Sequence, residues 1–139
     1  PIPNMASDTM FAMPRRARHM EVGRAGERAA AAYLVAKGYR VIERNYRCRR
    51  AEVDLIVQRD GALVFVEVRT RCGDSLGQPE ETLTAAKLRR LARHAQAYAA
   101  WRHWRGACRI DAVCVVLAPR HFGLGHRVVR LDHYEHITA

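Results

Sequence analysis

The sequence predicts an α/β fold in which helices pack against a mixed β-sheet. Two helix-forming stretches, residues 22–37 and 84–105, alternate with strand-length runs rich in Val, Ile and Phe. The resulting order is helix, three strands, helix, strand, strand, which is typical of a sandwich around a central sheet. With 139 residues, 49% of them hydrophobic, the chain is large enough for one domain with a buried core.

The first 21 residues show neither a helical nor a strand period. They contain three prolines and end in a basic stretch that includes Arg15, Arg16, Arg18 and His19. We interpret residues 1–21 as a mobile basic arm and residues 22–139 as the folded domain. Such an arm either contacts phosphates or is an extension without function.

Residues 22–37 are rich in alanine and predict a helix that Gly38 terminates. Helical spacing gives this helix a buried stripe made of Val22, Ala25, Ala29, Tyr33 and Ala36. A short strand is expected to follow at residues 40–46.

Residues 52–57 and 63–69 predict a β-hairpin closed by Asp60-Gly61, a preferred two-residue turn. Closure by two residues places Arg59 opposite Ala62 and, further along, Asp54 opposite Glu67. Because strand side chains alternate, Asp54 and Glu67 share one face, and Val53, Leu55 and Val57 share the other.

The second helix, residues 84–105, has a predicted stripe made of Leu88, Leu91, Ala95, Tyr98 and Arg102, and Gly106 ends it. Its first half carries Lys87, Arg89, Arg90 and Arg93 on the remaining faces. Trp101 and Trp104 near its end either stack nucleic-acid bases or serve the commoner purpose of packing. Strands are expected at residues 108–117 and, as an edge, at 128–131.

The charge of the chain favours a polyanionic partner. Lys and Arg outnumber Asp and Glu by 24 to 14, a net charge of +10, which suits the phosphates of nucleic acid. The alternative is an Arg-rich genome with no such partner. No cysteine pair has zinc-site spacing, and no stretch resembles a membrane span or a signal sequence, so we expect a cytoplasmic protein without contact with a membrane.

The facing carboxylates of Asp54 and Glu67 indicate a metal site. Two carboxylates opposite each other in a sheet repel unless a positive charge lies between them. Mg²⁺ binds one or two carboxylates while keeping waters and phosphate oxygens as further ligands. The alternative is that Arg69, Arg71 or Lys87 neutralises the pair.

Several motifs together resemble the YraN family of bacterial proteins. The resemblance covers about residues 22–116, and its joint order and spacing are specific. The motifs are Gly23-x2-Gly26-Glu27-x2-Ala30, Tyr33-Leu34-x3-Gly38-Tyr39, Arg44-Asn45-Tyr46-Arg47, Glu52-Val53-Asp54-Leu55-Ile56, Phe65-Val66-Glu67-Val68-Arg69-x-Arg71, Gly77-x-Pro79-x-Glu81 and Lys87. That family is similar to the PD-(D/E)xK nucleases and to archaeal Holliday-junction resolvases, which implies a restriction-endonuclease-like three-layer sandwich, a mixed central β-sheet flanked by helices.

The resemblance also implies roles for individual residues. Asp54 and Glu67 match the metal-binding acids of the nuclease motif, and Glu27 matches a further carboxylate, so Mg²⁺ or Mn²⁺ is the expected cofactor. The motif lysine is Arg69 here. A guanidinium stays protonated and cannot act as a general base, but it can stabilise charge on a scissile phosphate.

These observations lead to a predicted metal-dependent endonuclease acting on DNA, including branched or damaged structures. Its catalytic residues are Glu27, Asp54, Glu67 and Arg69. Its expected nucleic-acid contacts are Arg71, Lys87, Arg90 and Arg93. Two alternatives stay open: a non-catalytic nucleic-acid-binding module on the same fold, and a purely structural partner protein. A two-fold homodimer is expected only by analogy with enzymes that cut both strands.

Overall fold

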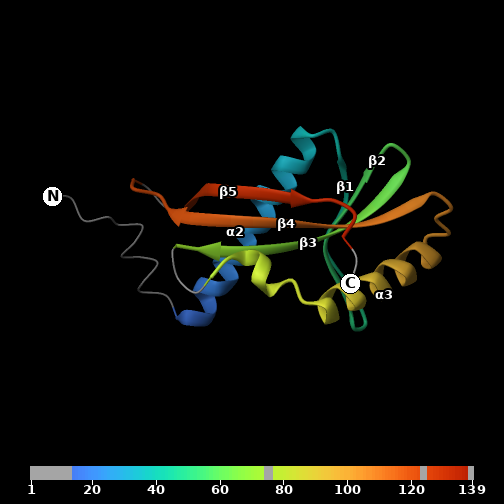
Figure 1. Cartoon of the computed structure of the whole chain (residues 1–139), viewed down its shortest axis with the longest axis horizontal. Helices are drawn as coiled ribbons and strands as arrows, with labels where there is room; N and C mark the ends of the chain where they lie inside the picture. Colours follow the sequence, from blue (N-terminus) through green and yellow to red (C-terminus); the bar gives the residue numbers. More distant parts are fainter. Residues whose placement is uncertain (1–13, 74–76, 123–124, 138–139) are drawn as a thin grey trace.

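The structure, a computed structural model, describes residues 14–73, 77–122 and 125–137 (Figure 1). It has the predicted α/β class: one open mixed sheet has a helix on each face. The strands lie side by side in chain order. They are β1 (Arg40–Cys48), β2 (Ala51–Arg59), β3 (Ala62–Cys72), β4 (Ala107–Pro119) and β5 (His126–Tyr134), and the helices are α2 (Arg15–Ala36) and α3 (Ala85–Trp101).

Helix α2 begins seven residues earlier than the sequence pattern predicted. Residues 15–21, which we assigned to a basic arm, form its first turns; residues 1–13 lie outside the described part of the chain. The end is as predicted: Gly38 has φ 96°, and the N–H groups of Gly38 and Tyr39 donate to the carbonyls of Val35 and Leu34. This is the Schellman pattern that a left-handed glycine permits.

The buried face of α2 differs from the predicted stripe by about one position. The residues buried on it are Gly26, Ala30, Ala31 and Leu34. Val22, Ala25, Ala29 and Tyr33 pack at the edge of the core, and Ala36 is exposed. In so alanine-rich a helix, small apolar residues occur on every side, so their spacing does not locate the buried face.

The hairpin between β2 and β3 forms as predicted. Asp60 (φ 51°) and Gly61 (φ 75°) both have positive φ, as a type I′ turn requires, and Arg59 pairs with Ala62. The pairing continues in this register to Leu55 and Val66.

The sheet is mixed because the chain crosses over between β3 and β4. After β3 it passes through a 3₁₀ helix, η1 (Pro79–Thr82), and then α3, so β4 runs parallel to β3. The Thr84 side chain caps α3 by accepting from the N–H of Lys87. Of the predicted stripe, Leu91, Ala95 and Tyr98 are buried, whereas Leu88 is only partly buried and Arg102 is exposed just after the helix ends. The helix ends four residues before the predicted end. It is followed by His103 in the left-handed conformation at φ 51°, upstream of the expected stop at Gly106.

The two helices cover opposite faces of the sheet. A core cluster containing Leu34 of α2 includes Leu55, Val57 and Val66, and a second cluster containing Tyr98 of α3 includes Ile56, Phe65 and others. The two clusters lie between the sheet and its helices, so the fold has three layers: helix, sheet and helix. No helix in the described ranges is long and apolar enough to cross a membrane.

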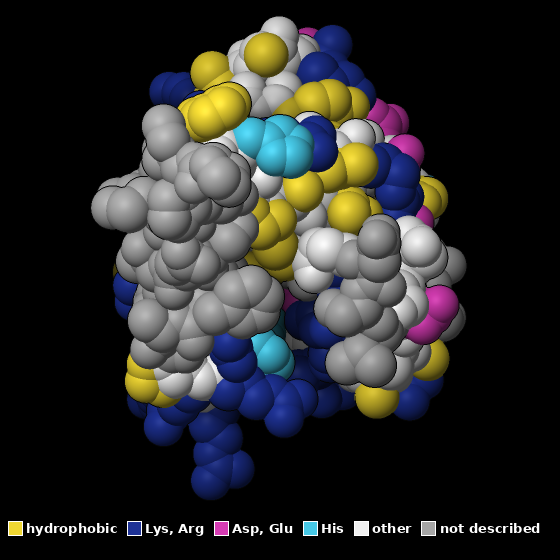
Figure 2. Space-filling view, turned by 90° about the vertical axis from the view of Figure 1, so that its left-hand side faces the viewer, with side chains coloured by type: hydrophobic (Ala, Val, Ile, Leu, Met, Phe, Trp, Pro, Cys, Tyr) yellow, Lys and Arg dark blue, Asp and Glu magenta, His cyan; other side chains and the backbone are white. Residues whose placement is uncertain are grey.

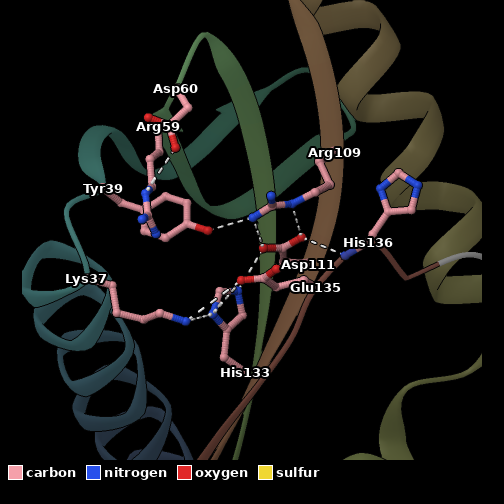
Figure 3. A network of polar contacts seen from close by, with 9 residues as sticks. All are labelled: Lys37, Tyr39, Arg59, Asp60, Arg109, Asp111, His133, Glu135 and His136. Atoms are coloured by element: carbon pink, nitrogen blue, oxygen red, sulfur yellow. Dashed lines mark hydrogen bonds and ion pairs between the residues drawn. The ribbon is translucent and has the colours of Figure 1, made fainter.

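A buried polar network fastens the C-terminal segment to the α2 side of the sheet (Figure 3). Asp111 is fully buried, and both its oxygens accept from the Arg109 guanidinium at 2.8 Å. His133 Nε2 lies 2.7 Å from Asp111 Oδ2, and the N–H of His136 donates to Oδ1. Arg109 also donates to the Tyr39 hydroxyl at 2.6 Å. The network joins β4, β5 and Tyr39, the residue before β1.

Candidate functional site

The strand β2 is irregular at Asp54. On one side its described pairing with β3 ends at Leu55. On the other side Arg44 pairs with Leu55, and Tyr46 pairs with Val53 in the same register, but Asn45, at φ 50°, is not among the residues paired with β2. A positive φ in a residue other than glycine is uncommon, and such residues concentrate at functional sites.

This irregularity corrects one prediction. Val53 does not share a face with Leu55 and Val57; it packs in the α3-side cluster, whereas the other two pack on the α2 side. Strict alternation, on which the prediction rested, fails where the strand bends. At this bend the N–H of Val68 donates to Asp54 Oδ2 over 2.8 Å, so a side chain takes a position that a regular ladder gives to a backbone carbonyl.

Four carboxylates line a cavity of about 630 Å³ at this bend: Glu27, Glu52, Asp54 and Glu67. Burial and the negative charge of Glu67 raise the pKa of Asp54 to about 7, despite the opposing hydrogen bond from Val68. Glu27 and Glu52 add to this repulsion. At neutral pH the site therefore favours either a proton or an added cation.

Glu27 reaches the cavity because α2 lies very close to β3. Gly26 permits this approach: a Cβ at this position would overlap the side chain of Thr70. Burial raises the pKa of Glu27, while a hydrogen bond from the Asn45 side chain lowers it. Asn45, which the sequence reasoning did not assign to the site, therefore positions Glu27 beside the irregular strand.

Arg69 lies between Glu67 and η1. Its Nη1 is 3.4 Å from Glu67 Oε1, and its Nε donates to Thr82 Oγ1 at 2.6 Å. Thr82 in turn donates to the carbonyl of Pro79, and η1 is tied to β5 by the ion pair of Arg130 with Glu80. The guanidinium is thus held in place, and it partly neutralises Glu67. This is one of the arrangements that the sequence left open.

Positive side chains surround the carboxylates. Of the predicted nucleic-acid contacts, Arg71, Lys87 and Arg90 line the cavity, whereas Arg93 is exposed and is not among its lining residues. Burial and the charge of Arg69 lower the pKa of Lys87. Arg71 Nε is buried without a hydrogen-bond partner in the described ranges, which leaves a donor available to an anion.

Five further Arg, His and Glu residues that were not among the predicted site residues also line the cavity: Arg15, His19, Arg50, Glu52 and His94. Four lining residues of α2 follow one another at intervals of four: Arg15, His19, Gly23 and Glu27. A predicted helix that began at residue 15 instead of 22 would have placed them on one face. Figure 2 shows a face that is hollowed at its centre, with Lys and Arg side chains gathered along its lower border.

The carboxylates do not by themselves form a closed metal cage. Within residues 14–73, 77–122 and 125–137, no three His, Cys, Asp or Glu side chains are grouped so that they could hold a metal ion. A cation that retains several waters needs fewer protein ligands, and Mg²⁺ commonly uses only one or two carboxylates. The donors fit such an ion, because Asp54 Oδ1 has no hydrogen-bond partner among the described residues and the pair carries unbalanced negative charge.

Comparison with known proteins assigns the family. The model of the uncharacterised protein family UPF0102 matches residues 26–115, which include Glu27, Asp54, Glu67 and Arg69. A UPF0102 protein of Symbiobacterium thermophilum is 54% identical over 99 residues, 70% of this chain and 84% of that protein. Another, from Prosthecochloris aestuarii, is 41% identical over 121 residues, 85% of this chain and 91% of that protein. The chain therefore belongs to the uncharacterised protein family UPF0102.

Proposed function

We propose that this protein is a metal-dependent nuclease that hydrolyses phosphodiester bonds in DNA. The observation that carries the proposal is the raised pKa of Asp54, about 7, beside Glu67 in a cavity bordered by Arg and Lys side chains. Perturbed carboxylates in a cleft mark functional sites. The names of the UPF0102 relatives state no activity, so the proposal depends on the residues and on the nuclease resemblance of the motifs.

Asp54 and Glu67 are the residues that would hold Mg²⁺ or Mn²⁺, with Glu27 nearby as a third carboxylate. Such an ion, when bound, supplies Lewis-acid polarisation of the phosphate and activation of water. The hydrogen bond from Val68 fixes one oxygen of Asp54 and leaves the other free to bind. The Asn45 side chain is hydrogen-bonded to Glu27 and holds that carboxylate near the pair.

The positive side chains would position the DNA and stabilise negative charge. Arg69 is fixed by Thr82 and Glu67, so its guanidinium is preorganised to face a phosphate in the cavity. It stays protonated and therefore does not act as a base. Lys87 and Arg90 border the same space, and the Nε of Arg71 offers a further donor to a phosphate oxygen.

A specific observation favours a second candidate, a nucleic-acid-binding module that does not cut. The ion pair of Arg69 with Glu67 reduces the negative charge that would attract a metal ion. In that case the cavity binds a phosphate through its Arg and Lys side chains alone, and added metal ions change neither the binding nor the integrity of the DNA.

The test is cleavage of plasmid, duplex and branched DNA with Mg²⁺ or Mn²⁺ and with chelator. We expect metal-dependent cleavage that Asp54→Ala and Glu67→Ala abolish. Asp60→Asn is the matched control, because its carboxylate is exposed in the β2–β3 turn, outside the cavity. DNA binding without cleavage under all these metal conditions would instead support the non-catalytic module.

A further inference from the structure

One flank of α3 continues from the cavity to an exposed tryptophan. Lys87, Arg90 and His94 line the cavity. They are spaced by three and four residues, and the same spacing continues to Ala97 and Trp101, so all five lie on one side of the helix. Trp101 is about 21 Å from Lys87 along the helix axis, at 1.5 Å per residue. In Figure 1, α3 runs below the sheet toward the end at which β4 begins.

Trp101 is exposed in a way that its neighbour Trp104 is not. The exposed fraction of Trp101 is 67%, although its ring packs at a tilt against buried Tyr98, with ring centres 5.9 Å apart. Trp104 is half-buried, and its Nε1 donates to the carbonyl of Ala107. Trp104 is therefore a packing residue, whereas one face of Trp101 is available to a ligand.

A positive charge contacts the same tyrosine against which Trp101 packs. Arg102 donates to the Tyr98 hydroxyl at 2.8 Å, and its guanidinium lies over the Tyr98 ring. Lys87 and Arg90 supply the charge at the other end of the flank. Cations that track a phosphate backbone, combined with an exposed aromatic ring, are the pattern of single-strand binding sites.

We infer that this flank of α3 binds a single-stranded segment of nucleic acid, with an unpaired base stacked on Trp101. The inference deepens the proposed function and rests on it, because the strand is the one whose phosphates occupy the cavity. Bases in an intact duplex are already stacked on one another and cannot stack on Trp101. The substrate class is therefore nucleic acid with an unpaired segment next to the site of cleavage.

Tryptophan fluorescence tests the stacking directly, in chelator so that no cleavage occurs. The chain has two tryptophans, so Trp101→Phe leaves Trp104 as the only one. We expect an oligothymidylate of about 16 nucleotides to quench the wild-type fluorescence and to leave the fluorescence of Trp101→Phe unchanged. An abasic oligonucleotide of the same length carries the phosphates without bases and should not quench. Quenching that persists in Trp101→Phe, or that the abasic strand reproduces, would overturn the inference.

Affinity as a function of salt separates stacking from phosphate binding. Trp101→Ala should weaken oligothymidylate binding about fivefold or more without changing the slope of log K against log salt. Arg90→Ala should reduce that slope by about 0.7 for each phosphate that is no longer neutralised. Trp101→Phe keeps a ring and should retain most of the affinity. If the alanine variant folds poorly, the fluorescence of Trp101→Phe still tests whether a base stacks on Trp101. Unchanged oligothymidylate affinity in a folded Trp101→Ala protein would contradict the proposal.

The two proposals fail separately. If oligothymidylate quenches Trp101 but no metal-dependent cleavage is found, the nuclease proposal is wrong and the single-strand site is supported. If wild type and Trp101→Ala cleave intact duplex DNA equally efficiently, the nuclease proposal is supported and the single-strand site is contradicted.

Discussion

The backbone N–H of Val68 donates a 2.8 Å hydrogen bond to Oδ2 of Asp54. It joins β3 to the side chain of β2 just beyond the point where the described pairing of the two strands ends. The bond favours the ionised carboxylate, yet burial and Glu67 outweigh it and raise the pKa of Asp54 to about 7. The position of this carboxylate is thus fixed, while ionising it is unfavourable in the absence of a cation. Both properties are expected of a cation-binding carboxylate.

Replacing Asp54 by Asn should stabilise the metal-free protein by roughly 0.5–2 kcal/mol, the range seen when functional-site strain is relieved. The amide oxygen can still accept from Val68, and the repulsion with Glu67 disappears. Mn²⁺ should raise the melting temperature of the wild type but barely change that of Asp54→Asn. Thermal melts in chelator and in Mn²⁺ measure both effects.

The pH dependence has a defined sign. A carboxyl with a raised pKa in the folded state contributes stability that is present below the unfolded value and is lost as pH rises through the folded value. For Asp54 the window lies between about 4 and about 7, and the difference in unfolding free energy between wild type and Asp54→Asn should change there. A variant that is less stable than wild type in chelator would show that a structural partner holds the charge of Asp54.

Arg69→Lys should preserve or raise the metal-dependent cleavage rate, because an ammonium both carries charge and can lose a proton. Arg69→Ala should lower the rate by about 10²-fold, the usual effect of removing one charge-stabilising donor. Single-turnover cleavage rates with saturating Mn²⁺ measure this. If Arg69→Lys abolishes an activity that the wild type has, the planar guanidinium held by Thr82 and Glu67 is itself required.

The parts of the site that depend on local chain geometry were predictable from sequence. A two-residue Asp60-Gly61 turn fixes the strand register as far as Leu55 and Val66. Counting residues therefore brings Asp54 near Glu67, although the predicted direct pairing of these two residues is not among the described pairs. The family resemblance added Glu27 on the first helix. No local sequence pattern, however, predicted the left-handed conformation of Asn45 or the change of face at Val53. Both arise where the strands β1, β2 and β3 meet.

The remaining parts of the cavity depend on tertiary packing. Arg15 and His19 enter it only because α2 starts at residue 15, and no strong capping signal marks that start. The sequence predicts that Arg93, like Lys87 and Arg90, contacts nucleic acid beside the acidic site, yet Arg93 is exposed and does not line the cavity. Basic residues on one helix thus differ in role according to the direction each one faces.

Arg93 therefore serves as a matched control for DNA affinity. Replacing Lys87 and Arg90 together by Ala should weaken duplex binding and flatten the salt dependence by about 0.9 for each phosphate that is no longer neutralised. Arg93→Ala removes the same kind of charge from the exposed side of α3 and should have a smaller effect on the slope. Titrations at several salt concentrations in chelator measure the slopes. Equal slopes for all three proteins would show that DNA does not dock at the cavity.

The last prediction concerns the buried pair of Asp111 and His133, which lies outside the cavity. Although burial opposes ionisation, hydrogen bonds from His133 and Arg109 lower the pKa of Asp111 to about 2. Asp111→Asn leaves Arg109 without its charged partner and should reduce the unfolding free energy by about 3–5 kcal/mol at neutral pH. Urea denaturation measures this loss.

The sign of its pH dependence is opposite to that of Asp54. A lowered pKa contributes stability that is present above the unfolded value, near 4, and is lost as pH falls towards 2. The stability difference between wild type and Asp111→Asn should therefore shrink across that interval. Asp132→Asn is the control: Asp132 is partly exposed beside Arg130, and such surface pairs contribute only about 0–1 kcal/mol. If both variants lose the same small amount, the network in Figure 3 does not hold the C-terminal segment.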